Sequence, residues 1–482
     1  MSAHGSLIPA HHPPNPQPLS RRALLGTAAA AVAAPALLAG CAVGGDGTPD
    51  QAEGQKNAKN PLGVAEDAPL EVVIFNGGFG EDYAKAHEVM YKENFPKATI
   101  NHSAVTEIGK TLQPRFIDGT PPDVINNSGA GQIDPGTLVA QGQLADLTDL
   151  LNAPSLDVAG KTVRQTLLPG AVETGSFDGK VFILNYAYTV YGIWYSTKLF
   201  NEKGWQYPKT WDEHIALCKT IKAAGIAPWT YQGLHPRYMS WPVISTAIKF
   251  AGPQVALDID NLQPNAWKSE GMRMAADAWY QIVRDKYILE GSPGLDHKQS
   301  QTEWCNGKAA FISCGSWLEN EQKAVTPAGF NMAVAPTPSL GKGDKLPFEA
   351  VRGTAGEPFV VPAKAKNLRG GMEYLRTMLS MKGAKDFTGK VSSLTIVAGS
   401  ADGATLPFGL DSCVKVLKAS GDKGFNWVYS TYYRKLERNL VDAACGEFFS
   451  GRIGPAEFLD KCQKGADEIA ADPAFKKYKR TA

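Results

Sequence analysis

Short apolar runs alternate with amphipathic segments early in this chain, and this alternation limits the folds that are open to it. Residues 70–75 and 99–105 have the pattern of strands, whereas residues 81–95 place apolar side chains at near-helical spacing. A second helix over 108–117 leads to a third strand that ends at Ile125. The order strand, helix, strand, helix, strand predicts an α/β fold with helices covering a parallel sheet.

Polar residues follow two of these predicted strands. Asn76 comes after the first strand, and Asn127 and Ser128 come after the third. Ligands of parallel sheets bind beyond the carboxyl ends of the strands, so we take these three residues as candidate ligand contacts. The alternative is local turn formation, which Asn and Gly also favour.

The rest of the body has mixed character. Residues 179–188 predict a strand whose extended run continues to Tyr195, and residues 309–314 predict another. Thr210 and Glu213 have the spacing of a capping box at the start of a helix. From residue 368 onward the pattern is mostly helical.

The N-terminus has the features of an export signal. Ser20-Arg21-Arg22 precedes an Ala/Leu run over 23–38, which ends in Leu-Ala-Gly-Cys at 38–41. This predicts a signal peptide over 1–40, and the paired arginines resemble a twin-arginine signal. The run is shorter than the ~20 residues of a membrane span. Leu-Ala-Gly-Cys resembles a bacterial lipobox, which implies that a diacylglycerol on Cys41 anchors the protein to the membrane.

Length, charge and cysteine content narrow the class of protein. A chain of 482 residues is too long for a single hydrophobic core, so two lobes are expected. They should follow a flexible tether over residues 41–68. Lys plus Arg is 49 and Asp plus Glu is 48, a balance that argues against nucleic acid as a partner. The six cysteines after Cys41 allow up to three disulfides, and buried free thiols are the alternative.

Motifs for enzymes and cofactors are missing from the sequence. It contains no GxSxG, HExxH or P-loop pattern, so we expect neither a cofactor nor a metal. Carboxylates are plentiful, however, and a pair such as Asp296 and Glu303 is conceivable in a glycosidase. The alternative for both residues is a solvated charge near a helix end.

Two further motifs resemble a known family. The first covers residues 194–204 and 207–213, and the second covers 304–311 with Gly-Ser-Trp at 315–317. Together they resemble the extracellular sugar-binding lipoproteins of bacterial ABC importers, and most closely those for N-acetylglucosamine and diacetylchitobiose. The family usually has Asn-Lys where this chain has Ser-Thr at 196–197, a departure in a scaffold turn. The similarity extends over about residues 69 to 480.

The resemblance implies a two-lobe periplasmic-binding-protein-like fold with a ligand cleft between lobes that are joined by several hinge crossovers. It also implies a function: a monomeric, non-enzymatic protein captures a mono- or oligosaccharide and delivers it to membrane permease subunits. A secreted polysaccharide-active enzyme is the alternative. The expected division of the chain is 69–175 and 315–365 for the first lobe, and 176–314 and 366–482 for the second.

Sugar chemistry and the resemblance together suggest the contacts. Aromatic rings cover the apolar face of a pyranose, and carboxylates or guanidinium groups hydrogen bond to its hydroxyls. The candidate aromatic residues lie in or beside predicted strands and loops: Tyr186, Tyr188, Trp229, Tyr231, Trp241 and Trp317. Core packing is the alternative for each, and the family motif favours Trp317 most. The charged candidates are Glu319, Glu357, Arg352 and Arg237.

Overall fold

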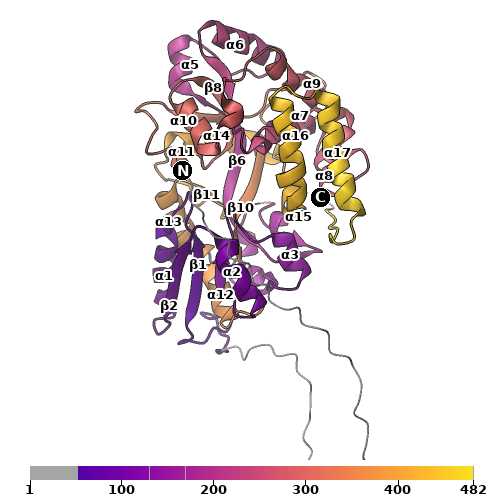
Figure 1. The fold of residues 1–482 in the computed structure, drawn as a ribbon. Coiled ribbons are helices and arrows are strands. Elements are labelled where there is room, and N and C mark those ends of the chain that lie inside the picture. The colour runs from indigo at the N-terminus through magenta and orange to yellow at the C-terminus, as the bar shows by residue number, and fades with distance from the viewer. Residues whose placement is uncertain (1–52, 130, 169, 481–482) are drawn as a thin grey trace, which may run out of the picture. The chain divides into compact units, whose positions relative to one another are not determined.

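The computed structural model of this protein describes residues 53–129, 131–168 and 170–480 (Figure 1). The predicted signal peptide and Cys41 lie outside the described residues. The end of the predicted tether is more ordered than the sequence suggests, because Leu62 and Val64 are buried against the core of the neighbouring sheet.

The central feature of the described residues is a nine-stranded sheet in the order β2-β1-β3-β10-β6-β8-β7, with β9 and β11 also paired to β6. Strands β2, β1 and β3 are parallel, as the sequence predicts, while β6 and β10 are antiparallel to each other. The strands are β1 (Leu70–Phe75), β2 (Ile100–Val105), β3 (Val124–Asn126), β4 (Ser176–Phe177), β5 (Lys180–Val181), β6 (Leu184–Ser196), β7 (Ala227–Thr230), β8 (Ala309–Gly315), β9 (Met332–Ala335), β10 (Arg352–Val360) and β11 (Leu394–Thr395).

Helices cover both halves of the sheet and make up most of the C-terminal region. They are α1 (Asp82–Asn94), α2 (Ile108–Ile117), α3 (Pro135–Ala140), α4 (Thr148–Asn152), α5 (Thr197–Lys203), α6 (Trp211–Ala223), α7 (Ser240–Ala251), α8 (Gln254–Asp260), α9 (Glu270–Arg284), α10 (His297–Cys305), α11 (Leu318–Glu321), α12 (Leu368–Met378), α13 (Met381–Val391), α14 (Phe408–Ser420), α15 (Tyr429–Tyr432), α16 (Asp442–Phe449) and α17 (Pro455–Ala471). The predicted capping box is present at the start of α6, where Thr210 accepts from the Glu213 amide.

Two long strands connect the halves of the sheet. The first part of β6 pairs with β10 and β11, and its last part pairs with β8 and β9. Figure 1 shows β6 and β10 running between the region of α1 and β1 and the region of α5 and α6. Side chains on these two strands therefore lie between the two halves of the sheet.

The packing of two segments differs from the predicted division into lobes. Helices α12 and α13 pack on α1 and share its buried cluster, although the sequence grouped them with the second lobe. Residues 318–334 pack around Trp194 and Trp304, although the sequence grouped them with the first lobe. Apolar periodicity shows that a segment has a face to bury, but not which distant partner covers it. The exact lobe boundaries stay a prediction.

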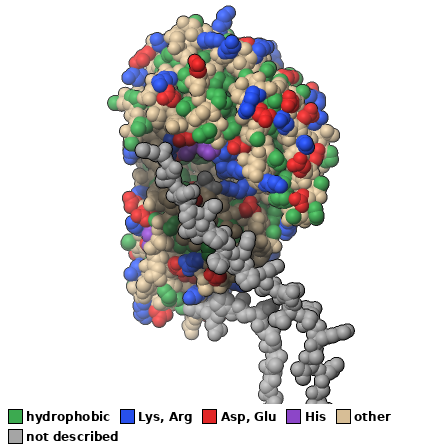
Figure 2. Space-filling model, viewed as in Figure 1, with side chains coloured by type: hydrophobic (Ala, Val, Ile, Leu, Met, Phe, Trp, Pro, Cys, Tyr) green, Lys and Arg blue, Asp and Glu red, His purple; other side chains and the backbone are tan. Residues whose placement is uncertain are grey.

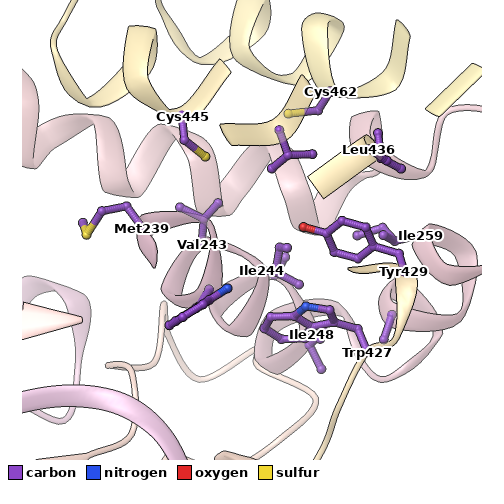
Figure 3. Close-up of a cluster of buried hydrophobic side chains, with 14 of the residues drawn as sticks. Met239, Val243, Ile244, Ile248, Ile259, Trp427, Tyr429, Leu436, Cys445 and Cys462 are labelled. Carbon is purple, nitrogen blue, oxygen red and sulfur yellow. The ribbon is translucent and has the colours of Figure 1, made fainter. Parts of the chain in front are cut away.

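A large buried cluster holds the C-terminal helices against α7 (Figure 3). Ile244 and Ile248 on α7 lie beside Trp427, Val243 lies on the side of Cys445 of α16, and all five side chains are buried. This packing fixes the position of Trp427, which also contributes to the cavity described below.

The six cysteines of the described residues are all buried and free, so the alternative of buried thiols is the correct one for them. Burial raises the pKa of each thiol for which a shift is resolved, as at Cys218 and Cys413. Among the described residues, no helix combines the length and the apolar character needed to cross a bilayer.

Candidate functional site

A cavity of about 260 Å³ lies where β6 and β10 run between the two halves of the sheet. Its walls come from these two strands, from the start of α7, from the turn after β8 and from residues 427–438. The cavity therefore combines segments that are far apart in the sequence.

One wall of the cavity is aromatic. The rings of Trp241 and Trp317 each meet Tyr191 edge to face, with centroids 4.8 and 5.5 Å apart. Tyr238 lies against Trp241 at 4.3 Å. Such a wall offers flat apolar area, and the Tyr and Trp rings also carry polar groups at their edges.

Trp317 takes its position because of the glycine two residues before it. A Cβ atom at Gly315 would lie 2.1 Å from the Trp317 ring, so a larger residue there would displace the indole. This contact gives a physical reason for the Gly-Ser-Trp motif at the end of β8.

Arg352, the first residue of β10, lies between two aromatic rings at the cavity. Its guanidinium carbon is 4.0 Å from the centroid of the Tyr191 ring and 3.8 Å from that of Trp427. The side chain is buried, and its Nε and Nη1 atoms have no hydrogen-bond partner among the described residues. Burial lowers the pKa of Arg352, because the charged form loses its hydration.

Further charged residues line the same cavity. The chain just before α16, part of which is π-helical (Leu436–Val441), contributes Arg434, Glu437 and Arg438. The short 3-10 helix before α7 (Pro236–Met239) contributes Arg237. Glu437 and Arg438 form an ion pair at 3.2 Å. Short π-helical segments are frequent at functional sites, since they reorient side chains within a helix.

Comparison with known proteins identifies the family. Residues 77–385 match the bacterial extracellular solute-binding protein family. The chain belongs to this family. The resemblance seen in the two sequence motifs is thereby confirmed, and the extracellular character of the family agrees with a location outside the cytoplasm.

Two relatives illustrate the range of similarity. The chain is 36% identical over 430 residues to the diacetylchitobiose binding protein NgcE of Streptomyces coelicolor. The aligned region covers 89% of this chain and 90% of that relative. It is 24% identical over 352 residues to the multiple sugar-binding protein of Streptococcus mutans, covering 70% and 76% of the two chains.

Solved structures share the fold at lower identity. A chitin oligosaccharide binding protein has a TM-score of 0.67 at 19% identity, with 85% of this chain and 100% of that chain covered. The GacH receptor of Streptomyces glaucescens has a TM-score of 0.64 at 18% identity, with 86% and 100% covered. The predicted two-lobe α/β fold of solute-binding proteins is confirmed by these likenesses.

The cavity brings together only part of the predicted site. Trp241, Trp317 and Arg352 line it, and so does Arg237. Each of these four residues lies at or near the end of a helix or strand.

Four predicted aromatic residues lie in other surroundings. Trp229 is fully buried among core rings, and its Nε1 donates to His214 at 3.2 Å. Tyr186 is also buried, and its hydroxyl donates to the Met378 carbonyl at 2.8 Å. Tyr231 is buried as well, and Tyr188 packs against the buried cluster that contains β1, α1 and α12. Core packing, the alternative given for each of them, describes these positions.

The predicted polar residues near the first lobe serve local structure. Asn127 closes a turn by exchanging two hydrogen bonds of 2.9 Å with the Ile133 backbone. Ser128 donates to Glu357 at 3.0 Å. Burial raises the pKa of Glu357, while hydrogen bonds from Asn126 and Ser128 act against this rise. None of these side chains lines the cavity.

Two other predicted contacts lie outside the cavity. Asn76 is exposed, and its backbone amide donates to the Val105 carbonyl at 2.9 Å. Glu319 accepts from the amides of Gly409 and Leu410 at 2.8 and 2.9 Å, where α14 begins. A carboxylate at a helix N-terminus is a common structural arrangement.

Asp296 and Glu303, the two carboxylates considered for a glycosidase, both have structural roles. Asp296 accepts from the Gln299 amide at 2.8 Å and caps α10. Glu303 pairs with Lys308 at 2.5 Å on the surface of the same region. Among the described residues, no cluster of three or more His, Cys, Asp or Glu side chains is arranged to hold a metal ion.

The sequence reasoning missed several residues of the cavity. Tyr191 stands in the extended run that becomes β6, and Trp427, Arg434, Glu437 and Arg438 stand in the region read only as helical. The one available signal was the density of aromatic and arginine residues over 427–438, where the helical pattern is also interrupted.

Proposed function

We propose that this protein captures a saccharide outside the cytoplasm and delivers it to the permease subunits of an ABC importer. The observation that carries the proposal is that the aromatic wall of Tyr191, Trp241 and Trp317 shares one cavity with polar and charged side chains. A pyranose needs both surfaces, because its C–H face is apolar and its rim carries hydroxyls. Family membership supports the same conclusion.

Binding without catalysis fits the lining of the cavity better than hydrolysis does. Glycoside hydrolysis commonly uses a pair of carboxylates that flank the scissile bond. Among the described residues that line the cavity, Glu437 is the single carboxylate, and it is paired with Arg438. We therefore propose that the protein releases its ligand unchanged.

The ligand we propose is an N-acetylated sugar, N-acetylglucosamine or diacetylchitobiose, because the relative NgcE is a diacetylchitobiose binding protein. Diacetylchitobiose should bind at least about tenfold more tightly than maltose, which corresponds to 1.4 kcal/mol. Calorimetric titration of both disaccharides measures this difference. Equal affinities would refute the N-acetyl preference, and chitin fragments produced during incubation would refute the binding-protein assignment.

We also propose that the protein is held at the membrane as a monomer by a lipid on Cys41, which follows the predicted signal peptide. Replacing Cys41 with serine should release the protein into the medium or block its maturation, because serine cannot carry the thioether-linked lipid. Membrane fractionation and mass measurement check this. Unchanged processing and unchanged membrane association in Cys41→Ser would contradict lipidation, and Cys218→Ser is a control because that thiol is buried in the fold.

A further inference from the structure

The pairing of β10 places the guanidinium of Arg352 between two aromatic rings. Arg352 lies opposite Tyr191 of β6, and it also forms a parallel bridge with Phe425. Trp427 stands two residues further along the segment that contains Phe425. The guanidinium carbon is 4.0 Å from the centroid of the Tyr191 ring and 3.8 Å from that of Trp427. Because both faces of the group are covered, a hydrogen-bond partner can reach it only at its edges, in its own plane.

The charge of this guanidinium is partly compensated, but its hydrogen bonding is not. Figure 2 shows Lys and Arg side chains gathered near the middle of the face in view, whereas Arg352 is only 6% exposed. Burial lowers the pKa of Arg352, while Tyr191 and Glu437 act against this change, and contact with two rings stabilises the cation further. Nε and Nη1, however, have no hydrogen-bond partner among the described residues. The group therefore lacks an acceptor rather than an opposite charge.

The other arginines that line the cavity already interact with residues of the chain. Arg237 is 3.5 Å from the carboxylate of Asp442, and Arg438 is 3.2 Å from that of Glu437. Arg434 also has an interaction within the chain. Among the arginines of this lining, the one held between the two rings thus gains most from an acceptor on the ligand.

The surroundings of Arg352 favour one kind of acceptor on a neutral sugar. A guanidinium only donates hydrogen bonds, and an amide carbonyl only accepts them, whereas a hydroxyl does both. The acetamido group of an N-acetylated sugar carries its carbonyl on a flat unit that ends in a methyl group. Rings of Tyr191, Trp241 and Trp427 all lie within 5.8 Å of the guanidinium carbon and offer the apolar surface that this methyl needs.

We infer that Arg352 determines the preference for N-acetylated sugars, because its guanidinium donates hydrogen bonds to the carbonyl oxygen of the acetamido group. The inference rests on the proposed function and assigns one residue to one group of its ligand. The aromatic wall serves the apolar face that pyranoses share, whereas Arg352 serves a group that glucose lacks. The hydroxyl that replaces the acetamido group in glucose extends less far from the ring and leaves the buried donors unpaired. Sites built to form such a bond discriminate strongly against analogues that cannot form it.

Three β-1,4-linked dimers test the inference on the unaltered protein. Diacetylchitobiose carries acetamido groups, cellobiose has hydroxyls in their place, and fully deacetylated chitobiose has ammonium groups there at slightly acidic pH. Titration calorimetry should show diacetylchitobiose binding about tenfold or more tightly than cellobiose. The deacetylated dimer should bind most weakly, because an ammonium group cannot accept a hydrogen bond and is repelled by a guanidinium. A deacetylated dimer that binds as tightly as diacetylchitobiose would overturn the inference.

Variants connect the preference to Arg352. Arg352→Gln should remove most of the difference in affinity between diacetylchitobiose and cellobiose. Arg352→Lys keeps the charge but loses the planar set of donors, so it should retain only part of the difference. Trp317→Ala should weaken the binding of both dimers and leave their affinity ratio unchanged, since its ring serves either sugar. Arg273→Gln on the exposed side of α9 is the matched control and should change neither affinity.

The affinity ratio separates recognition from a structural role. If Arg352 only supported the fold, both affinities would fall together in Arg352→Gln and the ratio would persist. That result would overturn the inference and leave the proposed function standing. Should Arg352→Gln fail to fold, the ratio in Arg352→Lys and the order of the three dimers on the unaltered protein decide between the two roles. Failure of the unaltered protein to bind any of the dimers would overturn both the inference and the proposed function.

Discussion

Replacing Trp229 with alanine should lower the free energy of unfolding by about 3–5 kcal/mol, the usual cost of removing a large aromatic side chain from a core. The ring is fully buried and lies 5.2 Å from Trp279 and 5.4 Å from Phe311. The change would also leave His214 without its donor at 3.2 Å. Urea unfolding followed by circular dichroism measures the loss as a shift in midpoint.

This prediction separates packing from binding at a residue that the sequence offered as a sugar platform. Under conditions in which Trp229→Ala remains folded, its affinity for diacetylchitobiose should stay close to that of the parent. Trp229→Phe retains much of the buried area and should lose clearly less stability than Trp229→Ala. A stable Trp229→Ala protein that no longer binds sugar would show that this indole contacts the ligand after all.

Trp317→Ala should have the opposite effect to Trp229→Ala: a large loss of saccharide affinity and a smaller loss of stability. Its ring is partly exposed to the cavity and touches Tyr191 and Trp241 edge to face, so its removal should weaken saccharide binding by about 1–3 kcal/mol, or roughly 5- to 150-fold. The loss in stability should be smaller than for Trp229→Ala, because less of the side chain is buried. Titration calorimetry and urea unfolding on the same preparation measure both quantities.

Trp205→Ala is a useful control for this variant, since Trp205 packs against Phe200 at 5.7 Å and does not line the cavity. It should reduce stability and leave affinity unchanged. Parent-like affinity in a well-folded Trp317→Ala protein would mean that the indole only supports its aromatic neighbours.

Local patterns in the sequence were sufficient for much of the fold. The strand at 70–75 and the helix at 108–117 have the predicted bounds, because apolar periodicity reports directly on the face that each element buries. The capping box at Thr210 was predictable for a similar reason, since its hydrogen bonds join residues three positions apart.

The cavity was predictable only in part, because its parts are brought together by tertiary packing. Tyr186 and Tyr191 both lie on β6, yet one faces a core and the other the cavity. The sequence around an aromatic residue in a strand is similar whether its ring faces a core or a cavity. Trp427 contacts Arg352, but the two residues are so far apart in the sequence that no local pattern could predict the contact.

The shared strands β6 and β10 also bear on how the molecule loses its structure. Strand β6 pairs with β10 along its first part and with β8 along its last part, and β10 joins β6 to β3, so neither half of the sheet contains a complete set of its own strands. We expect the two halves to unfold in one cooperative event rather than as independent folding units. A fragment cut between them would leave unpaired strand edges, which are prone to aggregate. The cavity that we propose for the sugar and the global stability of the protein thus depend on the same pair of strands.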